Sequence, residues 1–274
     1  MNLLTSVLVV LLTLCVIAWL VIRPERLTRP GRLVPRQRRQ IIRALPWWQR
    51  LDARRRARLL DQVVRLEKDM PIVPGDGFEP DESQRMAILA HVAVCSLAPD
   101  INPYWLPDEL VVFGDDVDTA VTTLPSDMIE DFSELAIGES WAAKRLAVSW
   151  PSIERAAAGG PDNPLVRRLA RWRMQQIVAD PDRNGSWMAA YDAAWQRWRA
   201  DPRPGARQLL RRIDEQTDLP GFVGAAAEAF FQRGRELART HPGLYNLLAT
   251  SFDFDTARHR PVGHRTPDVS SAGS

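Results

Sequence analysis

The chain has 274 residues, of which 45% are hydrophobic and 26% charged, and this balance fits one globular domain of about 200 residues with short appendages. The net charge is +2, but residues 23–43 hold eight arginines against one acid, so the remainder is mildly acidic. This distribution excludes a basic, nucleic-acid-binding surface spread over the whole domain.

The N-terminal segment is an apolar run. Leu3 to Ile22 is interrupted only by Thr5, Ser6 and Thr13, and a helix of this length crosses a hydrocarbon core of roughly 30 Å. A cleaved signal peptide is the alternative interpretation. It would need a basic start, a shorter run and a small-x-small site before Arg23, and all three are missing. Residues 1–22 are therefore predicted to be an uncleaved transmembrane anchor, with membrane contact through residues 3–22.

A basic segment follows the run. Its arginines are Arg23, Arg26, Arg29, Arg32, Arg36, Arg38, Arg39 and Arg43. Basic residues after a first membrane helix hold that side in the cytoplasm, which predicts a single-pass protein of the inner (cytoplasmic) membrane with its N-terminus outside and its domain cytoplasmic. The cluster either acts on topology alone or also rests on anionic headgroups. Several prolines predict that residues 23–45 form a linker without regular structure.

The soluble part alternates helical and strand patterns. Apolar spacing predicts a helix from Pro46 to Asp69, a turn-rich loop over Pro71–Pro80 and a mostly buried helix from Glu82 to Ala98. The expected strands are Leu110–Phe113, Ala120–Thr123 and Leu146–Trp150. The expected later helices are 151–158, 164–179, 186–200, 204–216, 221–240 and 242–251. This order predicts an α+β domain over residues 46–255, with a disordered tail at 256–274.

Several kinds of active site have no support in the sequence. Gly159-Gly160 lacks the lysine and the preceding strand of a phosphate-binding loop. No Gly-x-Ser-x-Gly turn is present, and the only histidine near Cys95 is His91, on the same apolar helix. We expect His91 to be a core residue. Independent nucleophilic catalysis is therefore not indicated.

Four segments, considered together, resemble a known family. They surround the stretch Asn163–Met174 in the chain, and they are Pro71–Glu79, Gly138-Glu139-Ser140-Trp141, Leu146–Trp150 and Glu228-Ala229-Phe230-Phe231. Their order and spacing resemble the Mlc titration factor family, also called the glucose-regulated metallopeptidases, over roughly residues 45–255. The resemblance implies a mostly helical, zincin-like core with a small sheet.

The resemblance also implies where a zinc site would lie. In that family a helix bears His-Glu-x-x-His, and a later glutamate completes the metal site. The register places the two histidines at Arg167 and Arg171, the catalytic glutamate at Arg168 and the distal glutamate near Gly221. A guanidinium has no lone pair to offer and stays charged, so these arginines would repel a dication. We therefore predict no catalytic residue, no metal ligand and no cofactor at these degenerate positions.

Two interpretations of the arginines remain open. Arg167, Arg168 and Arg171 share one side of a helical wheel, and they either form a solvated basic face or line the remnant groove. In the groove they need acidic partners. These come from within the chain (Asp214, Glu215, Asp218 or Glu228) or from an external anion or partner protein.

The resulting hypothesis is a membrane-anchored pseudopeptidase that binds a partner on the cytoplasmic side. The namesake of the family binds a transcriptional repressor, so the resemblance implies a protein partner, with a transcriptional regulator as one class, and no nucleic acid. Two alternatives stay open. One is an active zinc-dependent peptidase with a relocated metal site, and the other is a structural subunit of a membrane complex.

Overall fold

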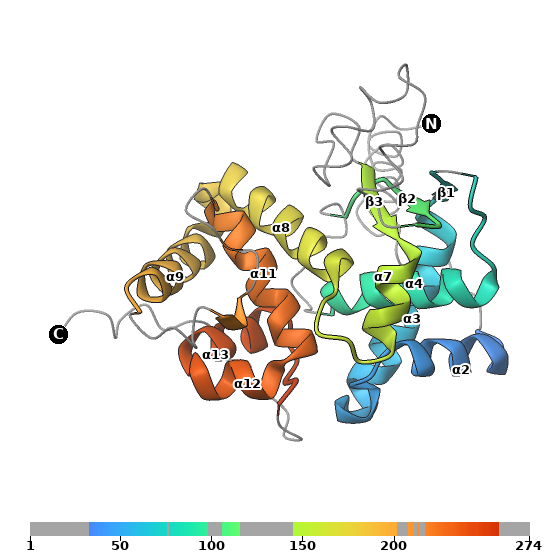
Figure 1. The fold of residues 1–274 in the computed structure, drawn as a ribbon, viewed down its shortest axis with the longest axis horizontal. Helices are drawn as coiled ribbons and strands as arrows, with labels where there is room; N and C mark the ends of the chain where they lie inside the picture. Colours follow the sequence, from blue (N-terminus) through green and yellow to red (C-terminus); the bar gives the residue numbers. More distant parts are fainter. Residues whose placement is uncertain are drawn as a thin grey trace, which may run out of the picture. The chain divides into compact units, whose positions relative to one another are not determined.

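The computed structural model describes residues 33–75, 77–97, 106–115, 145–201, 208–210, 213 and 217–257, without the side chains of 181–183. The predicted membrane helix at residues 3–22, the strand at 120–123 and the segment 138–141 lie outside these residues. Across the described ranges, no helix is both long and apolar enough to cross a membrane. The chain divides into two units, Met1–Arg32 and Leu33–Ser274, and the elements below belong to the second (Figure 1).

The sheet has three parallel strands in the order β1-β2-β3. These are β1 (Ile72–Pro74), β2 (Glu109–Phe113) and β3 (Arg145–Ser149), and Val111 of the central strand pairs with Val73 and Ala147. After their first residues, β2 and β3 are buried, as continuous apolar runs in parallel sheets are. The predictions of β2 and β3 are confirmed. β1 was missed, because a three-residue strand ending in proline looks like part of a turn-rich loop.

The N-terminal part of the domain starts earlier than expected. Residues 35–44 form the helix α2 (Pro35–Ala44), so the prediction of an irregular linker through residue 45 is wrong there. Pro35 occupies the first turn, where proline favours a helix, and Ile41 and Ala44 are buried in the core. The next helix, α3 (Ala53–Asp69), begins after the 3-10 turn η2 (Trp48–Arg50), seven residues later than Pro46.

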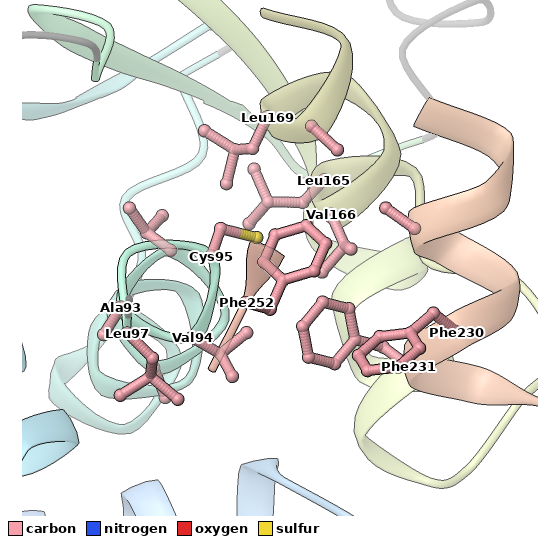
Figure 2. Close-up of a cluster of buried hydrophobic side chains, with 14 of the residues drawn as sticks. Ala93, Val94, Cys95, Leu97, Leu165, Val166, Leu169, Phe230, Phe231 and Phe252 are labelled. Carbon is pink, nitrogen blue, oxygen red and sulfur yellow. The ribbon is translucent and has the colours of Figure 1, made fainter. Parts of the chain in front are cut away.

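The centre of the core is α4 (Glu82–Cys95). Asp81 caps its start by accepting the N–H of Gln84 at 2.8 Å, and every residue from Met86 to Cys95 is buried, as predicted. Figure 2 shows its C-terminal end packed against Leu165, Val166 and Leu169 and against the rings of Phe230, Phe231 and Phe252. Burial raises the pKa of the Cys95 thiol to about 12, so this cysteine is protonated and not nucleophilic at neutral pH.

The second half of the domain is helical. Its helices are α7 (Trp150–Ala157), α8 (Pro164–Ala179), α9 (Pro181–Arg199), α11 (Leu219–Gln232), α12 (Gly234–Thr240) and α13 (Pro242–Ser251). The single helix expected at 221–240 is thus two, and the helix expected from 186 begins at 181. α8 lies along α11, and α9 packs on α8 (Figure 1). The domain is mostly helical with a small parallel sheet, in agreement with the predicted α+β class.

The segment after α13 is attached to the core, so the prediction of a disordered tail from residue 256 is wrong at its start. Thr256 is fully buried and donates to the carbonyl of Phe230 at 2.6 Å. Asp253, with φ of 48°, is buried and accepts from Arg55 at 2.6 Å and from Arg58 at 3.1 Å. These bonds connect the segment to α11 and α3.

Candidate functional site

The helix that carries the predicted site begins after a tight turn. Gly159 has a φ of 84°, and its N–H donates to Ala156 at 3.0 Å while the N–H of Gly160 donates to Arg155 at 2.8 Å. This pattern is a Schellman motif that ends α7. Asn163 then caps α8, since its side chain accepts the N–H of Val166 at 3.2 Å. Gly159-Gly160 therefore terminates a helix and positions the start of α8.

One side of α8 packs into the core. Leu165, Val166, Leu169 and Ala170 are buried there. Arg173 lies further along α8. Its guanidinium carbon is 5.6 Å from the ring centroid of Phe252, and its Nη1 donates to the carbonyl of Ser251 at 3.2 Å. Burial lowers the pKa of Arg173 from its ordinary value.

The other side of α8 meets α11, and Arg167 lies at the start of this contact. Its Nη1 is 3.7 Å from Oε2 of Glu228, whose side chain is 6% exposed. The other oxygen, Oε1, accepts the backbone N–H of Asn163 at 2.6 Å. A buried carboxylate is costly unless it is hydrogen-bonded and paired, and Glu228 meets both conditions beside the positive N-terminal end of α8. The start of α8 is thus in direct contact with Glu228, which lies in one of the segments that carry the family resemblance.

Arg171, one turn further along, faces the start of α11. Its Nη2 lies 3.7 Å from Oδ2 of Asp218, and the two side chains are 36% and 52% exposed. Asp218 also caps α11, because Oδ1 accepts the N–H of Gly221 at 2.8 Å. Gly221 therefore lies in the first turn of α11, next to the acid that pairs with Arg171. An ion pair this exposed contributes little to stability.

Between these two ion pairs the helix backbones approach closely at Gly224. A Cβ added to Gly224 would lie 2.7 Å from the carbonyl oxygen of Arg167 and 3.2 Å from Cβ of Arg171. Only glycine permits such an approach without a shift of one helix. Gly224 was not predicted to lie at this contact, although an isolated glycine in a helical pattern is a usual sign of close packing.

Arg168 points to a different neighbour. Its Nη1 donates to the carbonyl of Ala147 in β3 at 2.6 Å. The structure therefore brings Arg167, Arg171 and Gly221 together at the α8–α11 contact and directs Arg168 to the sheet. Of the acids proposed as internal partners, Glu228 and Asp218 take this role, while Asp214 and Glu215 lie outside the described residues.

The residues at this contact do not fit a zinc ion. Zinc in a peptidase needs three protein ligands with free lone pairs. Arginine supplies none, and Gly221 has no side chain. In the part of the chain that the structure describes, no three His, Cys, Asp or Glu side chains gather as a metal site would require. The arrangement can instead hold charge, since each of two guanidinium groups faces a carboxylate across the helix pair.

His91 is buried on α4 and belongs to the core, as expected. Its Nε2 lies 3.1 Å from the carbonyl oxygen of Ala44, while Nδ1 has no hydrogen-bond partner among the described residues. Nε2 therefore carries the proton that is donated. Burial lowers the pKa of His91 to about 4, so the ring is neutral at physiological pH.

Comparison with known proteins adds two findings. A family model described as glucose-regulated metallo-peptidase M90 matches residues 19–165. An uncharacterized protein of Synechocystis sp. is 25% identical over 220 residues, which cover 74% of this chain and 78% of that protein. The family match includes the three strands, α4 and α7, and it ends in the first turn of α8, two residues before Arg167.

Proposed function

This chain belongs to the glucose-regulated metallopeptidase M90 family, and we propose that it is a catalytically inactive member, anchored in the cytoplasmic membrane, that binds a protein partner. The observation that carries the proposal is the set of contacts around α8. The register of the family resemblance aligns Arg167 and Arg171 with the zinc-binding histidines, and the side chains of these arginines reach Glu228 and Asp218 of α11.

The chemistry of the family explains why these substitutions remove activity. Two imidazoles four residues apart hold the zinc ion, and the glutamate between them deprotonates the metal-bound water. Arg168 stands at the glutamate position and donates to a backbone carbonyl. A permanent cation cannot act as the general base, and two more cations beside it disfavour a dication.

The arginines are also accommodated in the packing of α8 on α11. Arg167 and Arg171 each place one positive charge opposite an acid of α11, so α8 and α11 stay electrostatically compensated. The close approach at Gly224 and the buried bond from Asn163 to Glu228 act alongside these pairs. A scaffold retained in this way serves binding, and the family resemblance favours a protein partner such as a transcriptional regulator.

The proposed location rests on the N-terminal sequence. The apolar run from Leu3 to Ile22 matches the length of a membrane helix, and the arginines after it favour a cytoplasmic domain.

Metal analysis of the full chain tests the loss of catalysis. The chain is purified in detergent, equilibrated with zinc, and assayed for bound metal and peptidase activity. We expect far less than one zinc per chain and no activity that a chelator removes. Stoichiometric zinc that is lost together with activity on chelation would show that the family chemistry survives through a relocated site.

A restored motif tests the register. The substitutions Arg167→His, Arg168→Glu, Arg171→His and Gly221→Glu should create zinc binding that the natural chain lacks. The matched control replaces the same three arginines by glutamine, which removes the same charges without adding ligands. Zinc binding by the control as well as the restored chain would mean that other residues hold the metal.

Partner capture from native membranes tests the binding role. The full chain is compared with a chain in which an unrelated membrane helix replaces residues 3–22. Capture that survives the exchange assigns the contact to the cytoplasmic domain. Capture lost with the original helix would instead favour the structural subunit of a membrane complex.

A further inference from the structure

A stripe of three arginines runs along α2, away from the site described above. Arg36, Arg39 and Arg43 are spaced three and four residues apart, so they fall on one side of the helix over about 10 Å. The opposite side holds Ile41 and Ala44, which are buried and pack toward α4. α2 contains no acidic residue. The helix therefore separates an apolar core side from a basic outer side.

The charges of this basic stripe remain available to a ligand. All three residues are exposed. Arg36 has a 72% exposed side chain and lies 3.8 Å from a carboxylate oxygen of Glu82, itself 43% exposed, and such a pair is weak in water. Within the described part of the chain, Arg39 and Arg43 form no ion pair. Just before the helix, Val34 is 50% exposed, which is unusual among the described large hydrophobic residues.

We propose that the basic stripe of α2 rests on anionic lipid headgroups of the membrane that anchors the chain. This inference rests on the anchor in the proposed function. Only residues 23–34 separate Ile22 from Pro35, and twelve extended residues span at most about 40 Å. Residues 23–34, which we call the tether, keep α2 near the membrane surface. There the high local concentration of lipid headgroups favours even weak contacts. The tether contains four further arginines, whose positive charges are also attracted to anionic headgroups.

The contact is electrostatic and stays at the surface of the bilayer. The apolar side of α2 is already committed to the core, so the helix cannot insert that side among the acyl chains as an amphipathic membrane helix does. Only the guanidinium groups reach the lipid. Lipid fits this stripe better than nucleic acid, because the chain outside residues 23–43 is mildly acidic and would repel a polyanion.

The full chain in lipid nanodiscs tests the inference. One set of discs contains phosphatidylcholine alone, and the other contains equal amounts of phosphatidylcholine and phosphatidylglycerol. Arginine modification by phenylglyoxal is followed residue by residue with mass spectrometry. We expect modification of Arg36, Arg39 and Arg43 to slow by on the order of tenfold or more in the anionic discs, and to recover in high salt. Arg235 and Arg239, exposed on α12, serve as internal controls and should react equally in both.

A matched pair of variants isolates the stripe. Amide hydrogen exchange of α2 should slow in anionic discs for the natural chain and for a control with Arg54→Gln, Arg65→Gln and Arg197→Gln, three exposed arginines elsewhere. The variant Arg36→Gln, Arg39→Gln, Arg43→Gln should lose this effect although its net charge is the same as that of the control.

The other outcomes each overturn the inference. Equal modification in both kinds of disc, with the chain retained by them, rejects the stripe and leaves the anchor intact. A chain that neither disc retains rejects the anchor as well. Protection by an added oligonucleotide, without protection by phosphatidylglycerol, would assign the stripe to nucleic acid.

Discussion

Two sets of arginine–carboxylate pairs differ in how tightly they are built. In the first, Asp253 accepts from Arg55 at 2.6 Å and from Arg58 at 3.1 Å, and its side chain is 8% exposed. In the second, Arg167 and Arg171 lie 3.7 Å from Glu228 and Asp218. The first set has the geometry of charge-assisted hydrogen bonds. The second compensates charge with looser geometry across the α8–α11 contact.

The local surroundings explain the difference. Burial acts to lower the pKa of Arg55, but hydrogen bonds and charges from Asp253 and Asp52 outweigh it, so this pKa is raised. Asp253 also adopts a left-handed backbone, which costs of order 1–2 kcal/mol and persists only where the surrounding bonds demand it. The α8–α11 pairs carry no such strain. We therefore interpret the first set as important for stability and the second as pairs that contribute less to it.

The largest expected effect comes from Asp253→Asn. Asparagine tolerates the left-handed backbone, so the change mainly removes the charge between Arg55 and Arg58. Leaving the buried Arg55 and the partly buried Arg58 without this carboxylate should lower the free energy of unfolding by about 3–5 kcal/mol. Urea denaturation measures this loss in the free energy of unfolding, with Asp61→Asn on the exposed face of α3 as the control. A loss below about 1 kcal/mol would remove the distinction between the two sets.

A pH series distinguishes the contribution of His91 to the free energy of unfolding from the contributions of the two sets of arginine–carboxylate pairs. The pKa of His91 is about 4 in the folded chain and about 6.5 in the unfolded chain, so the unfolded chain binds this proton first as pH falls. The contribution of neutral His91 to the free energy of unfolding is fully present above pH 6.5. It should fall by about 3 kcal/mol between pH 6.5 and 4. Denaturation curves of the natural chain and of His91→Gln measure the difference. A decline of equal size in both would assign it to the carboxylates.

The substitution Gly224→Ala tests the close approach of α8 and α11. The added methyl would meet the carbonyl oxygen of Arg167 at 2.7 Å, so one helix must shift at a cost of about 1–3 kcal/mol. Gly243→Ala on α13 is the matched control, because its Cβ meets nothing within 4 Å. The unfolding midpoints of the two variants in urea should therefore move apart. Equal midpoints would mean that the helix pair yields without cost.

A double-mutant cycle compares the two sets directly. Arg167→Gln and Glu228→Gln, alone and together, should give a coupling energy of about 1 kcal/mol. The same cycle on Arg55→Gln and Asp253→Asn should give about 3 kcal/mol, since its N···O distance is 2.6 Å instead of 3.7 Å and its arginine is 10% instead of 19% exposed. Coupling energies of similar size would show that distance and burial do not separate the sets.

The smallest effect is expected for Arg171→Gln. Its pair with Asp218 is partly exposed, so the free energy of unfolding should change by less than about 0.5 kcal/mol. A larger loss in urea denaturation would place Arg171 among the structural arginines.

Local pattern was a good guide to some elements and a poor one to others. The mostly apolar stretch of α4 and the bounds of α8 were predicted within a few residues, because burial patterns and helix ends depend on neighbours in the chain. α2 was missed because Pro35 was interpreted as a breaker, although proline in a first turn starts a helix. Thr256 was predicted to lie in a polar tail. Its buried hydrogen bond to Phe230 joins residues far apart in the chain, so no local pattern indicates it.

Residue identity alone determined the chemistry that α8 lacks. Arginine has no lone pair for zinc in any conformation, so the prediction at residues 167, 168 and 171 did not depend on the fold. Only the tertiary structure decided what these side chains contact. Glu228 was one of four possible acids, and Ala147 was not foreseen as the acceptor of Arg168. These contacts depend on how α11 and β3 pack against α8, and packing between distant segments is not encoded in any local pattern.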